Sequence, residues 1–112
     1  MDEMRLDGMG VAPGVLETIA VQAASAVEGV ASVDGGGLAG LVAKGQGRAK
    51  GVEVRMSEDG LEVDVHLSLA YGRPLHETAR EVQEAVTEAL QGMTDQAVKS
   101  VDVYVDQVVF KE

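Results

Sequence analysis

The sequence predicts an α+β domain, a two-layer sandwich in which two helices pack on one face of a small mixed sheet. Residues 51–72 alternate apolar and polar side chains on either side of an Asp-Gly pair, which is typical of a β-hairpin. Residues 13–27 and 74–91 carry apolar side chains at steps of three and four, which is typical of amphipathic helices. Residues 97–110 alternate again. The predicted order is helix, short strand, loop, hairpin, helix, strand.

The first helix is predicted from Pro13 to Val27, because proline suits the first turn of a helix. Its apolar face consists of Leu16, Ile19, Ala20, Ala23 and Val27. Gly29 suits a helix stop, and residues 30–33 are predicted to form a short strand. For residues 1–12, the sequence leaves open an edge strand or a loose segment.

The hairpin has one apolar face, which both helices are expected to cover. On its longer strand this is the odd-numbered face, made of Leu61, Val63, Val65, Leu67, Leu69 and Tyr71. The opposite face carries Glu62, Asp64, His66 and Ser68. We therefore expect the odd-numbered face to be core and the polar face to be a candidate docking surface.

The second helix, from Pro74 to Gln91, places its apolar stripe and its glutamates on different faces. In the last strand the apolar positions switch from odd to even numbers at Asp106-Gln107, which predicts a β-bulge. This strand could run parallel to the second hairpin strand or antiparallel to the first. The sequence leaves both pairings open.

Composition narrows the classes of function for what is expected to be a single domain, residues 1–112. The net charge of −10 and the three aromatic residues oppose nucleic-acid binding. The absence of cysteine excludes disulfides and thiolate chemistry. No secretory signal or membrane-spanning run is apparent, so a cytoplasmic location is expected.

The two histidines are the first residues to test for chemistry. Asp64, His66 and Ser68 share one side of a strand, but successive members lie about 7 Å apart, too far for a catalytic triad. His76 has only Glu77 beside it, whereas a metal site needs three or four convergent ligands. The sequence therefore predicts no catalytic residue, no cofactor and no metal.

A glycine-rich, basic loop over residues 34–51 is the more interesting exposed feature. The candidate interaction residues of this loop and the strand after it are Lys44, Arg48, Lys50 and Arg55. They could contact anionic lipid head groups or an acidic partner; the alternative is a solvated loop that happens to be basic. Residues 37–40 form a GxxG sequence, but its residues are apolar, which disfavours RNA binding.

Four segments resemble the alkaline-shock and general-stress protein family of bacteria. They are IAVQAASAVEGVASV (19–33), DVHLSLAYGRPL (64–75), REVQEAVTEAL (80–90) with the following Met-Thr pair, and VKSVDVYVDQVVF (98–110). The resemblance implies a non-enzymatic protein associated with stress and cell-envelope maintenance. It also implies that some members reach the membrane through a partner, and that others accompany fatty-acid or dihydroxyacetone-type kinases.

Three functions are therefore carried forward. The first is a structural or protein-interaction module in the envelope stress response, with a protein partner, self-association through a sheet edge, or peripheral attachment at the inner face of the membrane. The second is a regulatory accessory protein of a lipid-metabolism enzyme. The third is a small RNA-binding protein, which the acidic composition disfavours.

Overall fold

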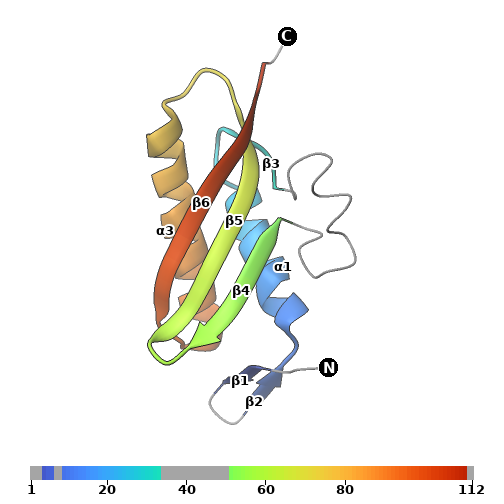
Figure 1. The fold of residues 1–112 in the computed structure, drawn as a ribbon, viewed down its shortest axis with the longest axis vertical. Helices are drawn as coiled ribbons and strands as arrows, with labels where there is room; N and C mark the ends of the chain where they lie inside the picture. The colour runs from blue at the N-terminus through green and yellow to red at the C-terminus, as the bar shows by residue number, and fades with distance from the viewer. Residues whose placement is uncertain (1–3, 7–8, 34–50, 111–112) are drawn as a thin grey trace.

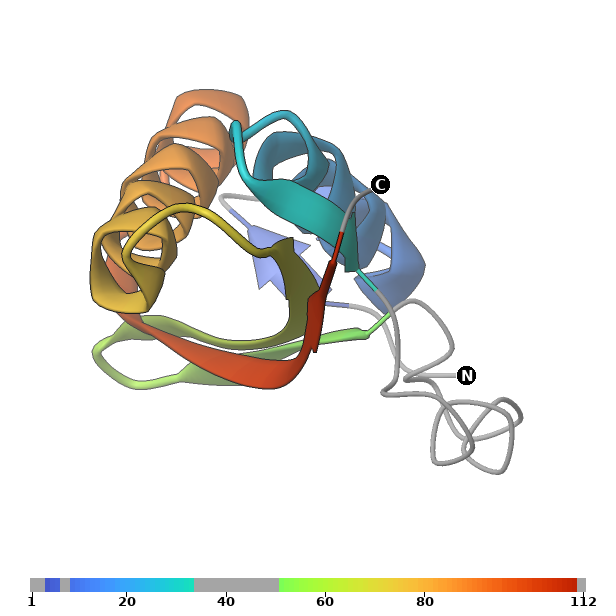
Figure 2. The same ribbon diagram turned by 90° about the horizontal axis from the view of Figure 1, so that it is seen from above.

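The computed structural model describes residues 4–6, 9–33 and 51–110 (Figure 1). The elements are β1 (Met4–Leu6), β2 (Met9–Val11), α1 (Pro13–Ser25), β3 (Val30–Val33), β4 (Val52–Ser57), β5 (Gly60–Ala70), α3 (Leu75–Thr94) and β6 (Val98–Val109). Strands β3 to β6 form a four-stranded mixed sheet. Both α1 and α3 lie on one face of that sheet (Figure 2). The α+β sandwich predicted from the sequence is confirmed.

The N-terminal strands need a correction. Residues 4–6 and 9–11 do form strands, but they pair antiparallel with each other as a separate two-stranded sheet. They are neither an edge of the main sheet nor a loose segment. The predicted glycine-rich loop falls within residues 34–50, which lie outside the described residues, apart from Gly51 at its end.

Strand β5 is the central strand of the main sheet. On one side it pairs antiparallel with β4 through residues 60–65 and with β3 through residues 67–69. On its other side it pairs in parallel with β6. The two strands β3 and β4 thus share one edge of β5, and β6 has the other edge to itself. This decides the pairing that the sequence left open.

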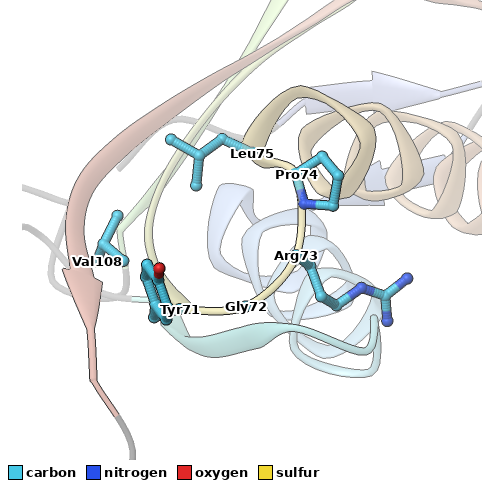
Figure 3. Close-up of a pocket in the computed structure, with 6 residues that line it drawn as sticks. All are labelled: Tyr71, Gly72, Arg73, Pro74, Leu75 and Val108. Atoms are coloured by element: carbon cyan, nitrogen blue, oxygen red, sulfur yellow. The ribbon is translucent and has the colours of Figure 1, made fainter.

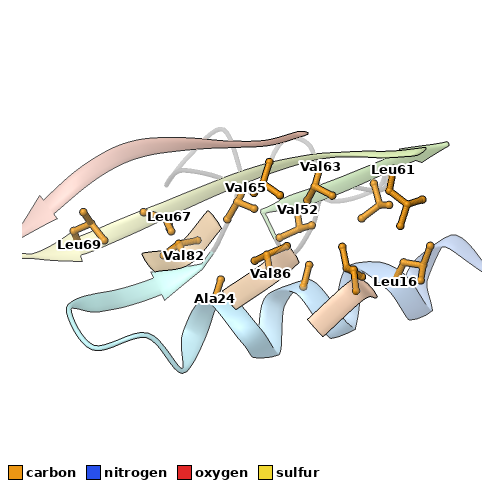
Figure 4. Packing of buried hydrophobic residues seen from close by; sticks show 14 residues of the cluster. Leu16, Ala24, Val52, Leu61, Val63, Val65, Leu67, Leu69, Val82 and Val86 are labelled. Carbon is orange, nitrogen blue, oxygen red and sulfur yellow. The ribbon is translucent and has the colours of Figure 1, made fainter. Parts of the chain in front are cut away.

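The core lies between β5 and the two helices (Figure 4). The odd-numbered side chains of β5 are buried, as predicted: Leu61, Val63, Val65, Leu67 and Leu69. The prediction was wrong for Tyr71, which follows the end of β5 and is 67% exposed. The helices contribute Leu16, Ala20 and Ala24 from α1 and Val82, Val86 and Leu90 from α3. Each helical set recurs at four-residue steps and the β5 set at two-residue steps, so both periodicities meet at one interface.

The helix ends differ from the predicted ones. Helix α3 continues through Gly92 to Thr94, because the Thr94 hydroxyl donates to the Leu90 carbonyl at 2.6 Å and accepts the Gln96 N–H at 3.1 Å. Asp95 then takes a left-handed conformation with φ of 60° and ends the helix. Helix α1 ends at Ser25, two residues before the predicted end.

Strand β6 contains two irregularities in its pairing with β5. Val105 pairs with Leu67 and Gln107 with Ser68, so Asp106 is the extra residue and the predicted bulge is confirmed. A second register shift, between Val98 and Ser100, makes Lys99 an extra residue as well. Both extra residues place a charged side chain beside the polar side of β5.

Candidate interaction surface

The face of the main sheet opposite the helices is called the open face here, because no described element covers it (Figure 2). Its polar and charged side chains include, from β4, β5 and β6, Glu53, Arg55, Glu62, Asp64, His66, Ser68, Lys99, Asp102, Tyr104, Asp106 and Gln107. These side chains form two clusters, one around Arg55 and one around His66.

Arg55 lies on β4 among carboxylates. Its guanidinium is 2.9 Å from Asp64, 3.3 Å from Glu62 and 3.5 Å from Glu53. The hydrogen bond to the Asp64 carboxylate raises the pKa of Arg55 above its ordinary value. Lys44, Arg48 and Lys50 lie outside the described residues. The one described member of the predicted basic group therefore has its charge balanced locally.

Glu62 is held by two cations. Lys99, the extra residue of the first bulge, donates to its carboxylate at 3.1 Å, and Arg55 donates at 3.3 Å. These two hydrogen bonds lower the pKa of Glu62 below its ordinary value, and the bond from Lys99 has the larger effect. Desolvation opposes the shift without reversing it.

Glu62→Gln is expected to make the loss of stability in acid shallower. Because the folded pKa of Glu62 lies below the unfolded value of 4.5, its stabilisation is present above that pH and is lost as the pH falls through the folded pKa. The free energy of unfolding, measured in urea between about pH 6 and pH 3, tests this. Glu58→Gln, in the exposed turn between β4 and β5, is the matched control. If the free energy of unfolding fell equally steeply with falling pH in the wild type and in Glu62→Gln, the argument would be contradicted.

His66 is engaged across the sheet, not along its own strand. Its Nδ1 lies 3.0 Å from the Asp106 carboxylate, and its ring stacks on Tyr104 with centroids 4.7 Å apart. The bulge places Asp106 beside His66. Ser68 instead contacts the Gln107 side chain at 3.5 Å. The structure brings His66 and Asp106 together and leaves Ser68 without a catalytic base.

His76 lies exposed on the first turn of α3. Within the part of the chain that the structure describes, no group of three or more His, Cys, Asp and Glu residues could hold a metal ion. The candidate features of the described residues are therefore surfaces and an edge strand.

An apolar pocket of about 640 Å³ opens at the carboxyl ends of β5 and β6 (Figure 3). It is lined by Tyr71, Gly72, Arg73, Pro74, Leu75 and Val108. Beside it the rings of Tyr71 and Phe110 stack with centroids 4.6 Å apart, and both side chains are about two-thirds exposed. The charge of Arg73 is met by Glu28 at 3.2 Å and Glu81 at 3.7 Å.

The third feature is the outer edge of β6. This strand pairs with β5 alone among the described elements. The side-chain amide of Gln83 on α3 donates to the Val101 carbonyl oxygen at 2.9 Å. Val103 and Val105, farther along the strand, are half-buried although they lie on the helix side of the sheet. The sequence could not identify this edge, since it depends on which neighbour β6 pairs with.

The comparison with known proteins agrees with this geometry. Residues 2–110 match the alkaline shock protein 23 family, which is described by a cell envelope-related function. The chain belongs to this family. The resemblance deduced from the four sequence segments is confirmed, and the match covers both helices and every strand described above.

Two relatives of this alkaline-shock-family protein come from Bacillus subtilis (strain 168). YqhY, an uncharacterized protein, is 32% identical over 97% of this chain and 82% of its own length. YloU, also uncharacterized, is 30% identical over 73% of this chain and 78% of its own length. They support membership of the family and add no activity.

Solved structures of MamM CTD variants resemble the fold. One has a TM-score of 0.51 at 19% identity, over 88% of this chain and 95% of that chain. Another has a TM-score of 0.50 with the same identity and coverage. This likeness concerns the fold alone. Within the described residues, neither helix is long and apolar enough to cross a membrane.

Proposed function

We propose that this alkaline-shock-family protein is a non-enzymatic interaction module in an envelope-related stress process, and that it acts by binding other proteins. The observation that carries the proposal is the part of the sheet that no described element covers, which consists of the open face and the outer edge of the 12-residue strand β6. Exposed edges and sheet faces are surfaces that proteins use to bind extended partners. The cell envelope-related function of the family supports the same role.

The side-chain contacts on the open face also favour binding over catalysis. Arg55 and Glu62 are satisfied by ion pairs, and His66 is engaged by Asp106 and Tyr104. Tyr104 presents a large ring that is 44% exposed on the edge strand β6 of this face. Aromatic side chains in such positions are frequent anchors of protein interfaces. Attachment to the inner face of a membrane would then follow from the partner.

Affinity capture from the cells that produce the protein, combined with light scattering on the purified chain, tests the proposal. We expect wild-type protein to retain one or more specific proteins and Tyr104→Glu to lose them. Tyr71→Glu, at the far end of the sheet, is the control and should retain them. A lipid-metabolism kinase among the captured proteins would favour the accessory role. A monomer that retains no protein in any form would contradict the proposal.

A further inference from the structure

We infer that the outer edge of β6 binds an extended, basic segment of a partner protein, which adds a strand to the sheet. The inference rests on the proposed interaction function and names the chemistry of the partner. Between the bulges at Lys99 and Asp106, residues 100–105 keep an unbroken register with residues 62–67. Six residues in this conformation give a straight edge of about 20 Å. An edge of this length accommodates an added strand.

The backbone groups on this edge can be assigned. In a strand, the N–H and C=O of one residue point to the same side, and the side alternates with each residue. The N–H groups of Leu61 and Tyr71 donate to β6-side carbonyls, so the odd-numbered residues of β5 face β6. Val101 lies opposite Val63 in the parallel register and therefore points outward, where its carbonyl accepts the Gln83 amide. Val103 and Val105 have the same parity within the straight segment. Their N–H and C=O groups are therefore the ones available to a new strand.

The charges on both sides of the edge favour a basic occupant. On the open face, Asp102 and Asp106 flank Tyr104, and Asp102 lies directly opposite Asp64 in the register. Arg55 donates a hydrogen bond to the Asp64 carboxylate. Asp102 is exposed, and its carboxylate is next to that of Asp64. Two carboxylates at neighbouring positions repel each other, and a cation on an added strand would relieve that repulsion.

The helix side of the edge is also mainly acidic. Beside Gln83, a shallow groove of about 270 Å³ on α3 is lined by Glu84, Thr87 and Glu88. The cation nearest in sequence to the groove residues is Arg80, one turn earlier on α3. The cation nearest in sequence to the edge is Lys99, which is bonded to Glu62. A second copy of this chain would bring the same carboxylates to the contact, and each copy carries a net charge of −10. Charge complementarity therefore favours a basic peptide over self-pairing.

The inferred segment alternates cations with β-branched residues. Its Lys or Arg side chains would face the open side near Asp102 and Asp106, where an arginine could also stack on the exposed Tyr104 ring. Its Val or Ile side chains would extend the apolar side next to Val103 and Val105. Cross-strand neighbours lie about 5 Å apart, so contacts of both kinds are within reach.

A fluorescently labelled ten-residue peptide of alternating lysine and valine, with blocked ends, is the probe, and anisotropy is the measurement. We expect micromolar binding that weakens as salt is raised, and no binding of the matching glutamate–valine peptide. Asp102→Lys should weaken binding about tenfold. Glu58→Lys makes the same charge change away from the straight edge and should alter binding by less than about twofold. Val103→Pro removes an outward N–H and should abolish binding.

The outcomes separate the inference from the proposed function. Equal losses for Asp102→Lys and Glu58→Lys would mean non-specific attraction and would overturn the inference. So would a wild-type dimer that Val103→Pro converts to a monomer, since a second copy would then occupy the edge. If wild type and Asp102→Lys capture the same cellular proteins equally, the basic-segment inference fails while the interaction function stands. If neither captures any, the proposed function fails as well.

Discussion

Replacing Gly60 with alanine is expected to lower the free energy of unfolding by about 3 kcal/mol, through backbone strain and a steric clash together. Gly60 has φ of 134°, a conformation that side-chain-bearing residues rarely adopt. A Cβ atom there would lie 2.5 Å from the carbonyl oxygen of Ala97. That carbonyl accepts the N–H of Leu61 at 2.9 Å, so it cannot move without breaking the contact where β6 joins the sheet.

Gly72→Ala is the matched control for this prediction. Gly72 has a similar φ of 124°, but an added Cβ would meet no atom within 4 Å. Its cost should therefore be backbone strain alone, about 1 kcal/mol. Urea unfolding followed by circular dichroism measures both variants. Equal destabilisation of the two would show that the close approach of Ala97 to Gly60 contributes nothing.

Leu67→Ala is expected to cost about 3 to 4 kcal/mol. Leu67 is fully buried on β5, and its backbone lies between Val33 of β3 and Val105 of β6. Truncation removes apolar area from the core and leaves a cavity that strands on both sides prevent from closing. The urea concentration at the midpoint of unfolding should fall, and the slope of the free energy of unfolding against urea concentration should change little.

Leu75→Ala removes the same atoms from a side chain that is 46% exposed at the start of α3. It should cost less than about 1 kcal/mol, because much of that surface is already in water. The two leucines differ in burial and not in chemistry. The ratio of the free energies of unfolding that the two variants lose therefore measures how much burial in the core contributes to stability. If Leu75→Ala proved as costly as Leu67→Ala, the assignment of the β5 odd-numbered face to the core would be wrong.

The apolar–polar alternation of β6 carries a signal for both of its bulges. The switch of apolar positions at Asp106-Gln107 predicted the second bulge, and the register confirms it. The first bulge, at Lys99, left the same kind of signal, because Val98 and Val101 lie on one side although they are three residues apart. That spacing is odd for a regular strand and could have been recognised.

The candidate site was harder to predict because its contacts are distant in sequence. Arg55 follows a basic stretch of the chain, yet its partners Glu62 and Asp64 come from the neighbouring strand. His66 and Asp106 are 40 residues apart and meet only because β6 runs parallel to β5. Of the acids near Arg55 and His66 in space, Glu53, 3.5 Å from Arg55, is also near in sequence, whereas Glu62, Asp64 and Asp106 come from other strands.

The sequence by itself determined the type of each described element of the sandwich, the buried face of β5 and the family of this protein. Those properties depend on side-chain periodicity and on local motifs, which a single chain displays directly. Only the tertiary structure decided that β6 pairs with β5, that no other described strand pairs with its outer edge and that Asp102 lies opposite Asp64. Strand order and register depend on hydrogen bonds between distant residues, and alternation alone is compatible with either neighbour.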